Sequence, residues 1–310
     1  MATVPSFWVQ SAAAKEISMS QIDSSQRRRL LQTLATSGFD LRASLPLSVL
    51  PPNLRKSLPK PLISKASVLL LGASAQRFWQ QIIDSHQGQS PSADAAVFAT
   101  ETKERHPVDT FTQSRIQAVM EHVCPTVNYA LLFPAPDAGS RKTGIPPETR
   151  SSSPRSAEVV PLQTLGRLAG WHHASPLGIG LHPEKGLWFA YRAVLVLADG
   201  TGLDTTATSR QPRQAIPTEQ KDVDQKELWS ICERCSDKPC LSACPADALR
   251  FAEAPQMESC SRYRLAETSA CKETCLARLA CPVGLEHRYE TQQIAYHYRY
   301  SLLQMRQTVD

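Results

Sequence analysis

Residues 232–245 read CERCSDKPCLSACP, and this stretch decides how the rest of the chain is interpreted. Its cysteines follow the spacing C-x2-C-x4-C-x3-C-P, at Cys232, Cys235, Cys240 and Cys244. A cubic iron–sulfur cluster is held by four thiolates, and short spacings allow one tight loop to supply several of them. The proline after the last cysteine turns the chain away from the cage. The longer x4 gap contains Pro239, whose bend can absorb the extra length.

A second and looser run follows, with the spacing C-x10-C-x3-C-x5-C-P. Its members are Cys260, Cys271, Cys275 and Cys281. The two runs together supply eight thiols, which is the number that two [4Fe-4S] clusters require, and in two-cluster ferredoxins the cysteine before the proline ligates the other cluster. The sequence therefore predicts a first set of ligands (Cys232, Cys235, Cys240 and Cys281) and a second set (Cys244, Cys260, Cys271 and Cys275).

Zinc binding and disulfide formation are the alternatives to iron–sulfur clusters for these cysteines. Zinc sites also begin with C-x2-C, but they usually come as paired C-x2-C units or with histidine, and a C-x3-C-P ending is not typical of them. Disulfide scaffolds are typical of secreted chains, whereas the N-terminus here lacks the apolar core of a secretory signal. A ninth cysteine, Cys124, stands alone and is expected to be a small buried hydrophobe.

The composition of the chain argues against a membrane-spanning protein and against a nucleic-acid-binding protein. The chain has 310 residues, 42% hydrophobic and 20% charged, as in ordinary globular proteins. No apolar run approaches the ~20 residues of a membrane-spanning helix. The net charge of +5 is spread thinly over residues 1–225, where Arg27, Arg28 and Arg29 are the only run of three cations, so no nucleic-acid partner is expected. Clustered thiols favour a reducing compartment, the cytoplasm, while the Ser/Ala-rich start of the chain leaves organelle import open.

The distribution of proline, serine and apolar residues divides the chain into segments. The predicted segments are a flexible tail (1–19), an α/β domain (20–198) with a mobile insertion (134–158), a linker (199–225), a dicluster domain (226–285) and a C-terminal helix (286–310). Within the α/β domain, the patterns predict strands at 67–72 and 129–133, helices at 20–37, 109–123 and 161–170, and a Pro-rich connection at 44–66. The alternation of strands and helices favours a layered arrangement.

A β-hairpin is predicted at 177–200, where two apolar runs flank the turn sequence HPEKG at 182–186. Alternation on its second strand sends Trp188 to one face and Tyr191 to the other. Together with His182 and Arg192 these are candidate cofactor-binding residues in a pocket facing the clusters, with Arg192 on an anionic group. The alternative is structural, with His182 stabilising the turn, Trp188 in the core and Arg192 in an ion pair.

Residues 226–282 resemble the dicluster ferredoxin domain of many redox proteins, including electron-transfer subunits of molybdenum oxidoreductases. The segment LAGWHHASPLGIGLHPEKGLWFAYRAVLVL at 168–197, followed by the cysteine region, is similar to an uncharacterised bacterial group of dicluster ferredoxin-like proteins. The same order resembles epoxyqueuosine reductase and the reductive dehalogenases, which hold a corrinoid beside two cubes, and 182–197 resembles cobalamin-trafficking decyanase proteins. The resemblance implies an α+β chain with a nitroreductase-like, layered α/β domain before a bacterial-type two-[4Fe-4S] ferredoxin domain.

This chain departs from the reductases in two places. The stretch AEVVPLQ at 157–163 has no counterpart of their catalytic Asp, and Gly170-Trp171 is followed by His172-His173 instead of Ile-Gly-Lys. The catalytic residues of the reductases are therefore not assigned to this chain, because a similar fold does not imply the same reaction. The predicted function is single-electron transfer with a redox partner protein as donor or acceptor. The alternatives are a redox enzyme whose clusters feed a corrinoid or other cofactor in the N-terminal domain, and a zinc-binding interaction module. The oligomeric state, the substrate and the catalytic residues stay open.

Overall fold

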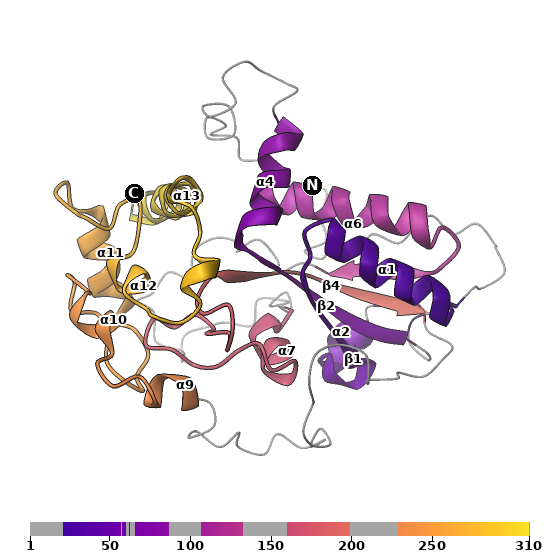
Figure 1. Ribbon diagram of the computed structural model, residues 1–310, viewed down its shortest axis with the longest axis horizontal. Helices are drawn as coiled ribbons and strands as arrows, with labels where there is room; N and C mark the ends of the chain where they lie inside the picture. Colours follow the sequence, from indigo (N-terminus) through magenta and orange to yellow (C-terminus); the bar gives the residue numbers. More distant parts are fainter. Residues whose placement is uncertain are drawn as a thin grey trace, which may run out of the picture.

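The computed structural model describes residues 21–56, 58–59, 62, 66–86, 107–132, 160–198 and 229–309. The predicted tail (1–19), insertion (134–158) and linker (199–225) lie outside the described residues. The described part is a mixed α+β structure with one small sheet, and the cysteine region lies beside it (Figure 1).

The sheet contains four antiparallel strands in the order β1-β2-β4-β3. Its strands are β1 (Leu41–Pro46), β2 (Ala66–Ser74), β3 (Tyr129–Leu132) and β4 (Phe189–Ala198). The apolar runs at 67–72 and 129–133 correctly predict β2 and β3. Because every pair is antiparallel, the domain is not built from the parallel units that a strand–helix–strand alternation suggests.

Two local predictions are corrected by the structure. Residues 41–46 form an edge strand that overlaps the start of the predicted Pro-rich connection (44–66). The strand can end at Pro46 because an edge strand tolerates a residue without an N–H. The hairpin at 177–200 forms only in part: the second run is β4, while the first makes a single bridge, Leu181 to His173, and His182 bridges to Gly186 across the turn. A proline and two glycines in 176–180 weaken the first run as a strand.

The helices belong to two groups. The sheet domain has α1 (Ser24–Thr36), η1 (Leu47–Val49), α2 (Pro52–Lys56), α4 (Ala75–His86), α6 (Pro107–Val123) and α7 (Leu162–Leu168). The cysteine region has α9 (Ser230–Glu233), α10 (Pro239–Ser242), α11 (Met257–Leu265), α12 (Leu276–Leu279), η3 (Leu285–His287) and α13 (Thr291–Val309). Helix α1 begins at Asp23, whose carboxylate accepts from the N–H groups of Ser25 and Gln26 in a capping box.

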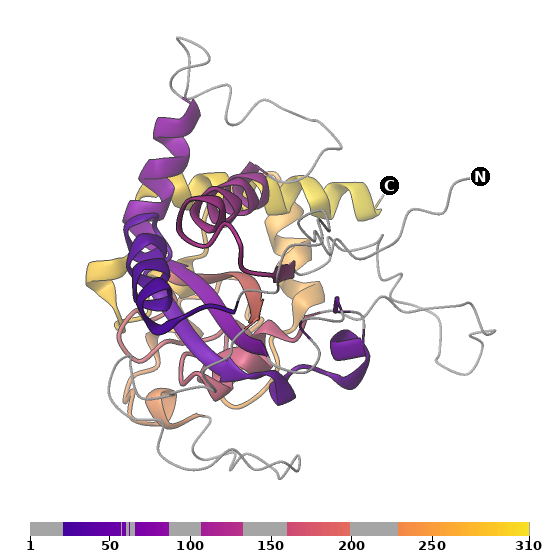
Figure 2. The same cartoon turned by 90° about the vertical axis from the view of Figure 1, so that its right-hand side faces the viewer.

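Each face of the sheet has its own core. Helices α1, α4 and α6 cover one face, where Leu34, Phe78 and Ile116 meet Leu195 of β4 (Figure 2). The other face is covered by α2, α7 and the loops beside them. Helix α13 returns to the first core, because the ring of Tyr296 packs 5.0 Å from that of Trp79 in α4. The cysteine region is thereby joined to the sheet domain through buried contacts.

Candidate metal centre

All nine cysteines lie in the described residues, and all nine are free thiols. Cys124 is 1% exposed in the core between the sheet and its helices, as expected for a small hydrophobe, and burial raises its pKa to about 11. The other eight lie between residues 232 and 281, on short helices and the turns that join them. They are the residues that could hold a metal or a cluster.

The first cysteine motif is shaped by a left-handed residue followed by proline. Cys232 lies in α9, and its carbonyl accepts from the N–H of Cys235 at 3.2 Å. Lys238 then takes φ +40°, and Pro239 starts α10, with Cys240 in its first turn. The ammonium of Lys238 donates to the carbonyl of Cys235 at 3.0 Å and stabilises this bend. The x4 gap is therefore absorbed by Lys238 as well as by the proline.

The thiols predicted as the first set influence one another electrostatically. Burial and then the charges of Cys240, Cys281 and Cys235 together raise the pKa of Cys232 to about 12. Burial and the charges of Cys281 and Cys235 also raise the pKa of Cys240. Cys281 comes from the far end of the region, yet it packs with Cys232 in one apolar cluster. The structure therefore brings these four residues together.

The remaining four thiols form a second group in the same way. Burial raises the pKa of Cys260, and the charges of Cys275, Cys244 and Cys271 add to the rise. Burial likewise raises the pKa of Cys271, with further contributions from Cys275 and Cys244. These charge effects link Cys244 with Cys260 and Cys271, and the assignment of the eight thiols to two clusters stays a prediction.

A site for one ion and a cubic cluster require different arrangements of their ligand thiols. Among the described residues, no three His, Cys, Asp or Glu side chains are arranged to hold a single metal ion. In a tetrahedral zinc site with Zn–S of about 2.3 Å, the sulfurs lie about 3.8 Å apart. A cubic cluster instead binds one thiolate at each of its four irons, so its ligands surround a cage. The thiol chemistry of each set fits such a cage.

Cations accompany both sets. Lys238 and Arg288 lower the pKa values of Cys232 and Cys281, against the larger effect of burial. Arg264, which is only 6% exposed, does the same for Cys260 and Cys271. Positive charge near thiolates favours the deprotonated state in which they bind metals.

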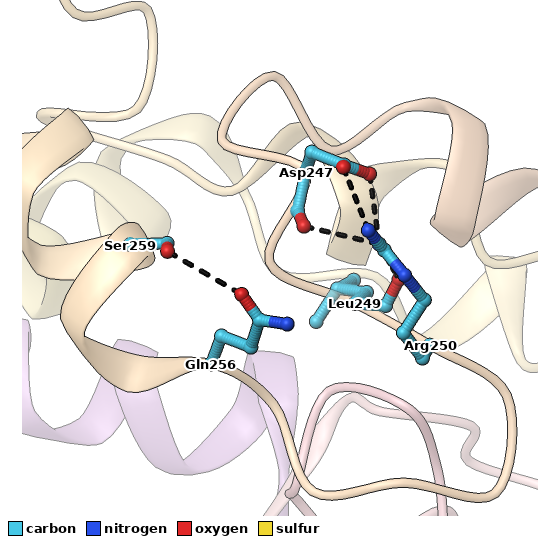
Figure 3. A network of polar contacts seen from close by, with 5 residues as sticks. All are labelled: Asp247, Leu249, Arg250, Gln256 and Ser259. Atoms are coloured by element: carbon cyan, nitrogen blue, oxygen red, sulfur yellow. Dashed lines mark hydrogen bonds and ion pairs between the residues drawn. The ribbon is translucent and has the colours of Figure 1, made fainter.

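The connection between Cys244 and Cys260 is held by local polar contacts (Figure 3). The guanidinium of Arg250 donates to both carboxylate oxygens of Asp247, at 2.8 and 2.7 Å, and to two backbone carbonyls. Asp247 itself adopts φ +48°, which this fork stabilises. The hydroxyl of Ser259 approaches the side-chain oxygen of Gln256 at 3.5 Å at the start of α11.

The first set lies against the segment that precedes β4. The Sγ of Cys232 approaches the carbonyl oxygen of Ala174 at 3.6 Å. Cys281 packs with Leu181 and Leu187, both 1% exposed. The first set is thus the group in contact with the sheet domain.

Two of the four upstream candidates have structural partners. The Nδ1 of His182 accepts from the N–H groups of Glu184 and Lys185, each at 3.1 Å, and so closes the turn. Trp188 is fully buried, with the guanidinium of Arg278 4.4 Å from its ring centroid. These partners agree with the structural alternative for His182 and Trp188, and a cofactor role for these two residues stays a prediction.

Tyr191 and Arg192 have different surroundings. The hydroxyl of Tyr191 lies 3.2 Å from Nδ1 of His172, whose pKa burial lowers to about 4, so this histidine is neutral at pH 7. Arg192 occupies a bulge in the β2–β4 pairing, and its guanidinium lies 4.5 Å from the centroid of Phe78. Its buried Nε has no hydrogen-bond partner among the described residues. A cofactor role for Tyr191 and Arg192 stays a prediction.

The sequence analysis missed two cations of the cysteine region. Arg264 donates to the carbonyl of Cys271 at 3.2 Å, and Arg278 donates to the carbonyl of Leu187 at 2.6 Å. No motif singles them out, because each reaches its partner only through the packing of α11, α12 and α13. In the described residues, no helix combines the length and apolar character that crossing a bilayer requires.

No protein-family model matches the chain, and no curated protein matches it. Among solved structures, it is similar to the C. elegans B12-trafficking protein CblC, a human MMACHC homologue, with a TM-score of 0.41, 12% identity, and coverage of 89% of this chain and 97% of that chain. It is also similar to the catabolic reductive dehalogenase NpRdhA in complex with 3-bromo-4-hydroxybenzoic acid, with a TM-score of 0.41, 15% identity, and coverage of 89% and 36%. NpRdhA without that ligand gives a TM-score of 0.40 at 14% identity.

Proposed function

We propose that this chain binds two [4Fe-4S] clusters through the cysteines of residues 226–285 and transfers single electrons. The proposal is supported by eight free thiols within residues 232–281 and by the charge effects among them, which link Cys232 with Cys281 and Cys260 with Cys244. When bound, such clusters supply one-electron exchange. The chain supplies the ligands, their burial, and the cations that offset a charge of about −2 on an oxidised cluster with its thiolates.

The proposal gives each part of the chain a role. The first set would pass electrons to or from the sheet domain, because Cys232 and Cys281 contact it. The second set would exchange electrons with an external redox partner protein. Free thiols of this kind need a reducing compartment, so we place the protein in the cytoplasm.

The test is the metal content of full-length protein prepared without oxygen. We expect about eight iron and eight acid-labile sulfide per chain, and a paramagnetic signal after reduction. Cys281→Ser should lower the iron content by about half, whereas Cys124→Ala, in the separate core, should leave it unchanged. Colourless protein with bound zinc and no sulfide would refute the proposal in favour of the zinc-binding interaction module.

A redox enzyme is the second candidate function. In it the clusters feed a corrinoid or another cofactor held by the sheet domain. The contact of the first set with residues 174–187 favours it, because electrons leaving that set would enter this domain. Titration of loaded protein with cob(II)alamin tests this candidate by absorbance. We expect a saturable spectral change that is weaker in Arg192→Gln. An unchanged spectrum would refute this candidate and favour the simple electron carrier.

A further inference from the structure

A side-chain hydrogen bond joins the turn at 182–186 to the cysteine region. The ammonium of Lys185 lies 3.2 Å from Nε2 of His287, which belongs to η3. An ammonium has three donors and no lone pair, so the imidazole nitrogen is the acceptor. His287 is therefore neutral in this arrangement, and its proton is on Nδ1.

The same imidazole nitrogen has a carboxylate beside it. Oε1 of Glu286 lies 3.7 Å from Nε2 of His287. A carboxylate can only accept, whereas an ammonium can only donate. Nε2 with its lone pair therefore bonds Lys185, and Nε2 with a proton bonds Glu286, but never both. Histidine is the side chain whose charge ordinarily changes between about pH 5 and 8. Protonation of His287 thus exchanges one partner for the other.

The charges around His287 favour release of Lys185 when the imidazole is protonated. An ammonium beside an imidazolium is repelled by it. On the turn, Glu184 is exposed. On the same side of the chain as His287, Arg288 donates to a carbonyl of α12 at 2.6 Å. Glu286 is the carboxylate that pairs with the imidazolium, and its side chain is 72% exposed.

The hydrogen bond lies where the two backbones meet. The N–H of His287 donates to the carbonyl of Gly284 at 3.0 Å. Gly186, which follows Lys185, approaches so closely that a Cβ on it would lie 1.9 Å from the carbonyl oxygen of Val283. Leu187, the next residue, packs with Cys281 of the first set. Release of Lys185 therefore loosens the contact between the first set and the sheet domain.

We infer that the hydrogen bond between Lys185 and His287 is a pH-dependent latch. With His287 neutral, the latch holds the turn on the cysteine region; with His287 protonated, the imidazole pairs with Glu286 and the turn is released. The latch is a property of the polypeptide. Its consequence, slower electron transfer between the first set and the sheet domain in acid, rests on the proposed function.

The test is deuterium exchange of full-length protein, followed by mass spectrometry at pH 7.5 and pH 5.5. The reporters are the amides of Glu184, Lys185 and Gly186, which all bond to His182. Protection is calculated against unfolded protein at the same pH. We expect it to be about tenfold lower at pH 5.5, the effect of losing one charge-assisted hydrogen bond. His182 itself stays neutral over this range, because burial lowers its pKa to about 4.

Three variants identify the group responsible. His287→Gln keeps a side-chain acceptor that does not titrate, so protection should be equal at the two pH values. Lys185→Met removes the donor, so protection should be low at both. His122→Gln is the matched control, because His122 is an exposed histidine at the end of α6. It should retain the tenfold response.

The outcomes separate the latch from the clusters. Equal protection of the wild-type turn at both pH values would overturn the latch, as would a pH response that persists in His287→Gln or Lys185→Met. If His287→Gln is unprotected even at pH 7.5, Lys185→Met decides. Iron and sulfide are measured on the same samples. Their absence from a protein that shows the tenfold response would refute the clusters and support the latch.

Discussion

The backbones of Gly186 and Gly284 lie against each other, and both residues have φ in the left-handed region, at +58° and +69°. A Cβ on Gly186 would lie 1.9 Å from the carbonyl oxygen of Val283, and a Cβ on Gly284 would lie 2.4 Å from the carbonyl carbon of Lys185. Because these neighbouring atoms belong to the backbone, they cannot move aside as the end of a flexible side chain can. This contact therefore seats the turn before β4 directly on the chain that follows Cys281.

Gly284→Ala should destabilise the protein and selectively weaken the first set. The substitution combines about 1–2 kcal/mol of left-handed strain with a clash against backbone. We expect a lower midpoint of thermal unfolding and an iron content reduced by about half, measured on the same preparation. Gly170→Ala is the matched control, because Gly170 has φ +72° but nothing within 4 Å of its Cβ position. Equal losses in the two variants would contradict a specific role for the contact.

Arg278→Met should cost about 3 kcal/mol in the free energy of unfolding. The substitution removes a charged hydrogen bond to the carbonyl of Leu187 and a cation–π contact with Trp188. Urea denaturation measures the change. Arg262→Met removes an exposed arginine paired with Glu258 and should cost less than about 0.5 kcal/mol. A small effect at Arg278 would mean that the sheet domain and the cysteine region are joined mainly by α13.

Acid should destabilise the protein through His182. Burial lowers the pKa of this histidine to about 4, with Lys185 also lowering it and Glu184 opposing. Between pH 6.5 and 4 the unfolded chain therefore binds a proton that the folded one does not, so stability falls as the pH is lowered. His182→Asn keeps an acceptor for the two turn N–H groups and removes the titration. Its stability should fall less steeply over that range, by up to about 1.4 kcal/mol per pH unit. An unchanged slope in urea midpoints measured against pH would contradict this.

Cys124 should resist alkylation in the folded protein. It is 1% exposed, so the reagent can reach its thiol only if the core of the sheet domain opens. After iron is removed with a chelator, iodoacetamide should modify the eight other cysteines first. Peptide mass spectrometry measures the order, and denatured protein is the control in which all nine react. Early labelling of Cys124 would show that the core of the sheet domain opens.

The local sequence pattern was sufficient to predict an element when the residues of that element alone determine its structure. The run at 67–72 predicts β2 because apolar residues follow one another in it, and the start of α1 follows from Asp23 and the helical pattern after it. The edge strand β1 was missed because its partner, β2, lies beyond a Pro-rich segment. The bulge at Arg192 was missed because it exists only as a register shift between two strands.

The sequence by itself determined which eight thiols lie in the cysteine region, and it predicts their division into two sets, because cysteine spacing limits which thiols one loop can bring together. It also determined the strongly apolar strands and their turn. Only the tertiary structure decided which cations lie in the cysteine region. Arg264 and Arg278 reach the carbonyls of Cys271 and Leu187 across helix packing, and no spacing in the chain encodes such contacts. It also decided that the turn before β4 rests on Gly284, because that approach depends on two distant residues without side chains meeting in space.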